Sequence, residues 1–293
     1  MSGAESFYLR KKRLEEDLLR SWSPAVESYA RLACRLGHYW QPLAFIRQHA
    51  PKPTDAVTLA AYMHLYLGTG HVQPVRQWGR FVGAGVQHPN LVEQHLRLAV
   101  TTGTAISINV SSERHHPSVE ILTEIVRLLD RRDSPADHIL NRQWESAEEL
   151  SECAYDLASF YAHANEHQLG LEVLGSWHRR VPDDPGIAIG CAVLLAVLRE
   201  PGQCRELCED MAYRGFRGVP FQILPLVAGE ERGAGLFEDL RRMLAAEPLY
   251  APINYVWRRH CPKWSFRSLE IAHRTAGKLT EAVNFGYRWK RST

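Results

Sequence analysis

Residues 151–218, SECAYDLASFYAHANEHQLGLEVLGSWHRRVPDDPGIAIGCAVLLAVLREPGQCRELCEDMAYRGFRG, decide the fold, because they read as two consecutive copies of one 34-residue pattern. The first copy starts at Ser151 and the second at Pro185. Small residues occupy positions 8 and 20 of both copies: Ala158 and Ala192, then Gly170 and Cys204. Larger apolar residues occupy positions 7, 11 and 24, as in Leu157, Tyr161 and Leu174. Small residues at positions 8 and 20 let two antiparallel helices approach closely, so the stretch predicts two stacked helical hairpins.

Proline marks the junction between the two copies. Pro182 ends the first hairpin, and Asp184 before Pro185 is typical of a helix N-cap followed by proline in the first turn. The pattern resembles the tetratricopeptide repeat. The repeat is degenerate, because Trp177 stands where that family usually has a small residue and Phe216 stands where the second proline is expected. Two ordinary helical hairpins with this spacing by chance are the alternative.

Apolar residues at helical spacing, broken by short glycine or proline segments, recur through the rest of the chain. The exception is Ile106–Val110, which alternates like a short extended segment. We therefore expect an all-α fold of stacked helical hairpins, a solenoid like that of tetratricopeptide proteins, with one short extended segment near 105–110. We expect an irregular helical region at 1–103, a connecting loop at 104–116, and a hairpin region with a basic, aromatic C-terminal cap at 117–293.

A short motif near the end suggests a second resemblance. Pro248-Leu249-Tyr250 and Pro262-Lys263-Trp264, with a hairpin before them and a helix after, look like the end of an uncharacterised bacterial domain family built of tetratricopeptide-like hairpins. This resemblance implies a bacterial source and a helical fold. It supplies no catalytic residues.

The composition argues against a strongly charged protein, a membrane-spanning protein and a secreted protein held together by disulfides. The 293 residues carry 35 Lys and Arg against 33 Asp and Glu, so the whole molecule is not strongly charged. No apolar run is long enough to span a bilayer and no secretion signal is evident, so we expect a cytoplasmic protein. The six cysteines lie in helical patterns and are expected to be reduced thiols in the core.

Residues 163–167, HANEH, match the zinc-peptidase pattern H-x-x-E-H. On one continuous helix, His163 and His167 would share a face and ligate zinc, with Glu166 as the base. The repeat register argues against this, because it places His163 at the end of one helix and His167 at the start of the next. With 14 histidines in the chain such a match also arises easily, so the zinc hydrolase is kept as an alternative.

The C-terminus combines basic and aromatic residues, a composition that can bind an acidic protein or single-stranded nucleic acid. The candidate binding residues there are Arg258, Arg259, Lys263, Trp264, Tyr287, Arg288 and Trp289. The alternative is a cap that seals the last hairpin. An acidic stretch that could steer a partner leads into the repeats: Glu145, Glu148, Glu149, Glu152 and Asp156.

No catalytic motif stands above these alternatives. Stacked hairpins commonly hold a peptide or helix in a groove, so we expect a non-enzymatic protein-interaction module without a cofactor, such as an adaptor, a chaperone or an immunity-type inhibitor. We expect a protein partner or a second copy of the chain, and no membrane. Zinc hydrolysis through His163, Glu166 and His167, and nucleic-acid binding through the basic C-terminus, are the alternatives.

Overall fold

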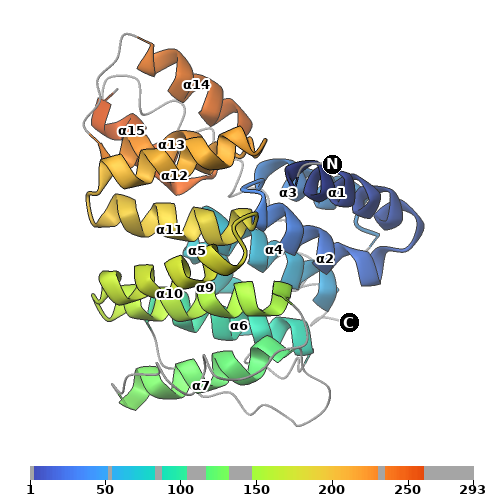
Figure 1. Ribbon diagram of the computed structural model, residues 1–293. Coiled ribbons are helices and arrows are strands. Elements are labelled where there is room, and N and C mark those ends of the chain that lie inside the picture. Colours follow the sequence, from blue (N-terminus) through green and yellow to red (C-terminus); the bar gives the residue numbers. More distant parts are fainter. Residues whose placement is uncertain are drawn as a thin grey trace.

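The computed structural model describes residues 3–51, 55–82, 88–103, 117–131, 147–229 and 235–260. Within these ranges the chain is all-α and contains no strand, as expected. The helices are α1 (Gly3–Arg20), α2 (Trp22–Arg35), α3 (Trp40–His49), α4 (Ala56–Thr69), α5 (Val72–Val82), α6 (Pro89–Thr102), α7 (Pro117–Arg131), α9 (Ala147–His163), α10 (His167–Arg180), α11 (Pro185–Val197), α12 (Pro201–Tyr213), α13 (Val219–Ala228), α14 (Leu236–Ala246) and α15 (Ala251–His260). Figure 1 shows α9 to α13 stacked along the molecule, with α1 to α4 packed beside the stack.

The two predicted hairpins are confirmed as α9 with α10 and α11 with α12. Their small residues make the predicted close contacts. A Cβ atom on Gly170 would come within 3.1 Å of the backbone oxygen of Ala158, and the Sγ of Cys204 lies 3.6 Å from the backbone oxygen of Ala192. Position 20 therefore meets position 8 in both copies, which is the reason the sequence keeps both positions small.

Two helices, α4 and α11, consist mostly of apolar residues around their whole circumference, and both are central. Most residues of α4 are fully buried, as are most residues of α11. A helix that is mostly apolar around its whole circumference must be surrounded by other helices. Accordingly, α4 packs against α2, α3, α5 and α6, whereas α11 packs against α2, α9, α10, α12 and α13.

The N-terminal helices join the hairpin stack at its loops. The Tyr8 hydroxyl accepts a hydrogen bond of 2.9 Å from the backbone nitrogen of Arg217, which follows α12. The Phe7 ring meets the Phe216 ring edge-on, with centroids 5.9 Å apart. One apolar cluster contains residues of α1 and α2 together with residues of α11 to α15. Helices from both sides of residues 104–116 therefore share a core.

Some expectations fall on residues that the structure does not describe. The connecting loop 104–116, with its extended segment, lies outside the described residues, and the division into regions stays a prediction. The five described cysteines are free thiols, as expected, and Cys261 lies outside the described residues. None of the described helices combines the length and the apolar character that a membrane crossing requires.

Candidate functional site

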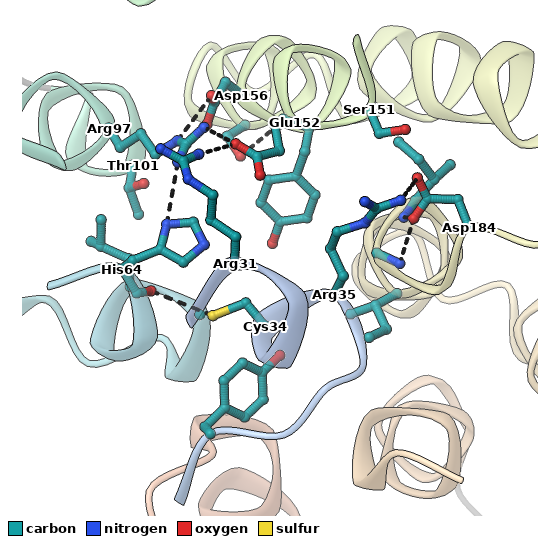
Figure 2. A pocket seen from close by; sticks show the side chains of 18 residues that line it. Arg31, Cys34, Arg35, His64, Arg97, Thr101, Ser151, Glu152, Asp156 and Asp184 are labelled. Carbon is teal, nitrogen blue, oxygen red and sulfur yellow. Dashed lines mark hydrogen bonds and ion pairs between the residues drawn. The ribbon is translucent and has the colours of Figure 1, made fainter. Parts of the chain in front are cut away.

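A pocket of about 160 Å³ opens where α2, α4, α6, α9 and α11 converge. Figure 2 shows arginine side chains from α2 and α6 facing carboxylates from α9 and from the start of α11 across this space. The lining residues come from positions 31 to 189 of the sequence, so the pocket exists only once the N-terminal helices lie against the hairpin stack.

Arg31, on α2, brings three carboxylates together. Its guanidinium contacts Glu27 one turn earlier at 2.6 Å, and it also pairs with Glu93 of α6 and Glu152 of α9. Because a guanidinium presents five donors in a fixed fork, one arginine can bind several carboxylates at once. Arg31 thereby ties α2 to both α6 and α9.

Arg97, on α6, makes a second and parallel set of contacts. Its guanidinium lies 3.0 Å from Glu93, 2.7 Å from Glu152 and 3.2 Å from the Oδ2 of Asp156. We call the six residues of this arrangement the ionic cluster: Glu27, Arg31, Glu93, Arg97, Glu152 and Asp156. It contains four carboxyl groups and two guanidinium groups.

His64 of α4 completes the polar wall as a neutral base. Its Nδ1 lies 3.2 Å from a terminal nitrogen of Arg97, which can only donate, and 3.3 Å from the Oε1 of Gln94, which can only accept, so the tautomer of the ring decides which of the two contacts is a hydrogen bond. Burial lowers the pKa of His64 to about 3, with Arg97 and Arg31 adding to the effect. The histidine therefore contributes no charge near neutral pH.

The two cluster carboxyl groups on α9 differ in acidity although they are one turn apart. Burial raises the pKa of Glu152, but Arg31 and Arg97 outweigh burial and hold this pKa well below its usual range. Burial also raises the pKa of Asp156, and Arg97 offsets this only in part, so the pKa reaches about 6. Near neutral pH both groups are ionised, and Asp156 is the one that titrates in the mildly acidic range.

A separate ion pair closes the other side of the pocket. Arg35 of α2 donates to the Oδ2 of Asp184 at 2.9 Å, while the Oδ1 of Asp184 accepts from the backbone nitrogens of Gly186 at 2.9 Å and Ile187 at 3.3 Å. Asp184 is the N-cap of α11, as predicted. One fully buried carboxylate therefore both starts α11 and fixes it to α2.

The remaining wall is apolar and contains an unusually exposed aromatic ring. Tyr155 is 42% exposed although it lines a concave site together with Tyr39, Leu67, Ile187 and Ile189. Its ring lies against Gly190, where a Cβ atom would come within 3.0 Å of the Tyr155 Cδ2 atom. Tyr155 is thus a partly exposed aromatic residue in the lining of a pocket that also contains buried charges.

The predicted zinc ligands lie elsewhere. His163 is the last residue of α9 and His167 the first of α10, with Glu166 as the N-cap of α10 and Asn165 between them at a φ of 65°. The chain therefore turns between the two histidines, and they share no helix face. No group of three potential metal ligands occurs among the described residues. The zinc hydrolase stays an untested prediction.

The predicted C-terminal site lies largely outside the described residues. Arg258 and Arg259 are the eighth and ninth residues of α15, and their side chains are not described. The rest of that site lies beyond the described ranges: Lys263, Trp264, Tyr287, Arg288 and Trp289. The preceding Trp257 is buried, and its ring centroid lies 5.4 Å from that of Phe237.

Sequence reasoning missed the ionic cluster. It grouped Glu152 and Asp156 in an acidic stretch that could steer a partner, whereas in the structure these two carboxyl groups pair with Arg31 and Arg97. Glu145 lies outside the described residues, and the side chains of Glu148 and Glu149 are not described. A usable signal was present, since three helices each carry charged residues four positions apart between apolar residues: 27 and 31, 93 and 97, and 152 and 156.

Searches of protein-family models, of curated proteins and of solved structures find no match to this chain.

Proposed function

We propose that this chain is a non-enzymatic protein-interaction module that anchors one side chain of a partner protein in the pocket between α2, α4 and α9. The observation that carries this proposal is the combination of a preformed recess, an exposed aromatic ring at Tyr155 and a surrounding set of buried charges. Interface hot spots have this form, in which a single anchor fills a desolvated pocket.

The volume of the pocket argues for a side chain rather than a cofactor. Pockets for cofactors and drug-sized ligands usually measure roughly 300–1,000 Å³. A cavity of about 150 Å³ holds a molecule the size of benzene. At about 160 Å³ the pocket matches one long side chain.

The polar groups of the pocket are suited to binding and give no support to catalysis. Asp184, Arg31 and Arg97 are each engaged in ion pairs with other helices, and His64 faces Arg97. The thiol of Cys34 lines the pocket beside His64, but it donates to the backbone oxygen of His64 at 3.7 Å and burial raises its pKa, which disfavours the reactive thiolate. The tetratricopeptide-like resemblance of α9 to α12 and the proposed cytoplasmic location are both consistent with an interaction module.

The test is to fill the pocket and measure capture of a partner. Ser159 lines the pocket one turn after Tyr155 on α9, and its hydroxyl bonds only to the backbone oxygen of Tyr155 among described residues. We expect Ser159→Trp to abolish stoichiometric co-purification of a partner from the native host, with circular dichroism unchanged. Ser28→Trp is the matched control, because Ser28 is an exposed residue of α2 that does not line the pocket.

Two results would count against the proposal. Equal capture by wild-type protein, Ser159→Trp and Ser28→Trp would place the interaction elsewhere on the molecule. If wild-type protein yields no partner at all and is a monomer by light scattering, the interaction function itself is rejected. A partner that proves to be a second copy of the chain would support it.

A further inference from the structure

The guanidinium and carboxyl groups that line the pocket pair with one another. There are three of each among the lining residues: Arg31, Arg35, Arg97, Glu152, Asp156 and Asp184. Arg97 lies 2.7 Å from Glu152 and 3.2 Å from Asp156, and Arg31 also pairs with Glu152. The third guanidinium pairs with the N-cap of α11 at 2.9 Å, on the other side of the space in Figure 2. When all six groups are ionised, their charges balance within the lining.

This internal pairing disfavours a charged guest. A cation would have to share a carboxylate that already binds arginine, and an anion would have to share a guanidinium that already binds a carboxylate. Weakening a buried ion pair is costly, because a charge is then left in the interior with less compensation. An uncharged guest leaves every pair in place, so the pocket is better suited to an uncharged side chain.

The rest of the lining is mainly apolar and aromatic. It includes Cys34, Tyr39, Leu67, Gly68, Tyr155, Gly186, Ile187 and Ile189. Tyr155 is 42% exposed, and Tyr39 is a second aromatic residue of the same lining. Aromatic rings pack edge-on or offset against one another, and such pairs are more favourable than the burial of their area alone. The lining therefore favours an aromatic guest over an aliphatic one.

The paired arginines add to this preference. A guanidinium donates hydrogen bonds in its own plane, so a flat face can contact a ring while carboxylates occupy the donors. The chain already uses this arrangement at Arg35, which pairs with Asp184 at 2.9 Å and lies over the Phe7 ring, 5.3 Å from its centroid. Arg31 and Arg97 line the pocket while they are engaged in ion pairs of the same kind.

We infer that the pocket takes the uncharged aromatic ring of a phenylalanine or tyrosine of the partner protein, packed against Tyr155 and the paired guanidinium groups of Arg31 and Arg97. This inference rests on the proposed interaction function and names the chemistry of the anchor. The size agrees, because a cavity of about 150 Å³ holds one benzene ring and the pocket measures about 160 Å³.

The first experiment titrates the protein with four probes of side-chain size by NMR at pH 7.5. The probes are p-cresol, its saturated counterpart 4-methylcyclohexanol, n-butylammonium and propionate. We expect p-cresol to bind at least about fivefold more tightly than 4-methylcyclohexanol, because only p-cresol has an aromatic ring, and the two charged probes to bind least. If p-cresol does not bind, or binds no more tightly than any one of the other three, the inference is overturned.

Variants locate the bound ring. Ser159→Trp should remove p-cresol binding and Ser28→Trp should keep it, whereas p-cresol binding that survives Ser159→Trp would contradict the inference. Tyr155→Leu keeps an apolar side chain but removes the ring, so it should weaken p-cresol by about fivefold and leave 4-methylcyclohexanol unchanged. Tyr213→Leu is the matched control, because Tyr213 is 93% exposed at the end of α12 and does not line the pocket. The wild-type titration decides the inference even if Tyr155→Leu does not fold.

Competition separates the anchor from the interaction function. Saturating p-cresol should reduce capture of the partner by wild-type protein, whereas n-butylammonium at the same concentration should not. If Ser159→Trp abolishes capture but p-cresol does not reduce it, the interaction function stands and the aromatic anchor is rejected. If p-cresol binds the pocket but capture survives Ser159→Trp, the pocket's preference for an aromatic ring stands and the interaction function is rejected.

Discussion

The carboxylate of Glu247 caps the start of a helix that lies more than 200 residues earlier in the chain. Its Oε2 accepts a hydrogen bond of 2.8 Å from the backbone nitrogen of Trp40, the first residue of α3, and its Oε1 accepts one of 3.0 Å from Tyr39. The first N–H groups of a helix have no partner within the helix, so Glu247 satisfies donors that α3 itself cannot. The link between α14 and α15 is thereby fixed to the N-terminal region.

Glu247 should make stability depend on pH. Burial raises its pKa to about 7, against the backbone N–H groups of Trp40 and Tyr39, which lower it. The pKa is therefore higher in the folded chain than in the unfolded chain, where it is 4.5. The folded state binds the proton more tightly, so the contribution of this group is complete below pH 4.5 and is lost as the pH rises through about 7.

We expect the free energy of unfolding of wild-type protein, relative to Glu247→Gln, to fall between pH 5 and pH 7.5, by at most about 1.4 kcal/mol per pH unit. Urea unfolding at several pH values measures this. The other titrating groups contribute equally to the free energy of unfolding of both proteins, so their contributions cancel in the difference. A difference that grows with pH would show that the two N–H groups, and not burial, control the titration of Glu247.

Removing Arg97 should strongly destabilise the fold. Arg97→Met leaves Glu93, Glu152 and Asp156 with less compensation in a buried site, and breaking a buried ion pair in this way costs about 3–5 kcal/mol. Arg241→Met is the matched control, because Arg241 is exposed and pairs with Glu238 one turn away, and it should change stability by less than about 0.5 kcal/mol.

A double variant separates charge from packing at Arg97. Adding Asp156→Asn to Arg97→Met should recover part of the loss, because it removes one carboxylate that Arg97 had compensated. Chemical denaturation of the four proteins gives the coupling energy. Strictly additive effects would mean that Arg97 stabilises the fold through its hydrophobic stem.

Asp184→Ala should cost more than the loss of an ordinary helix cap. Asp55→Ala is the comparison, because Asp55 caps α4 by accepting from the backbone nitrogen of Thr58 at 2.7 Å, and its loss should cost about 1 kcal/mol. Asp184 also pairs with Arg35, so its replacement should cost at least about 1 kcal/mol more. Asp184→Asn can keep the cap, so its loss of stability should be smaller than that of Asp184→Ala and larger than that of Asp55→Ala. Equal losses for both alanine variants would show that the Arg35 pair adds nothing.

Gly218→Ala should separate two elements that now touch. A Cβ atom on Gly218, the N-cap of α13, would lie 2.4 Å from the backbone oxygen of Leu36, the C-cap of α2. Neither backbone can yield without moving its helix, so we expect a loss of about 1–3 kcal/mol. Gly202→Ala in α12 meets nothing within 4 Å and should be neutral or stabilising by up to about 1 kcal/mol. Differential scanning calorimetry distinguishes them, and equal effects would contradict the close approach.

Local features were predictable from the sequence and long-range charge pairing was not. The contact of position 8 with position 20 lies within one hairpin, so the small residues Ala158 and Gly170 were enough to predict it. The pairing of Arg31 with Glu152 spans 121 residues, and no local spacing specifies which distant helix a charged face will meet. The four-residue spacing of charges on α2, α6 and α9 signalled buried charge, but choosing the partners required the packing of the three helices.

The distribution of the ionic cluster along the chain sets when its ion pairs can form during synthesis. Residues up to Arg97 bring two guanidinium groups and two carboxyl groups, Glu27 and Glu93. Only α9 adds the other two carboxyl groups. At about 5–20 residues per second, Glu152 is made roughly 6–24 seconds after Arg31. A nascent chain that ends before α9 therefore lacks Glu152 and Asp156, and Arg31 and Arg97 can fasten α2 and α6 to the hairpin stack only after α9 has been translated.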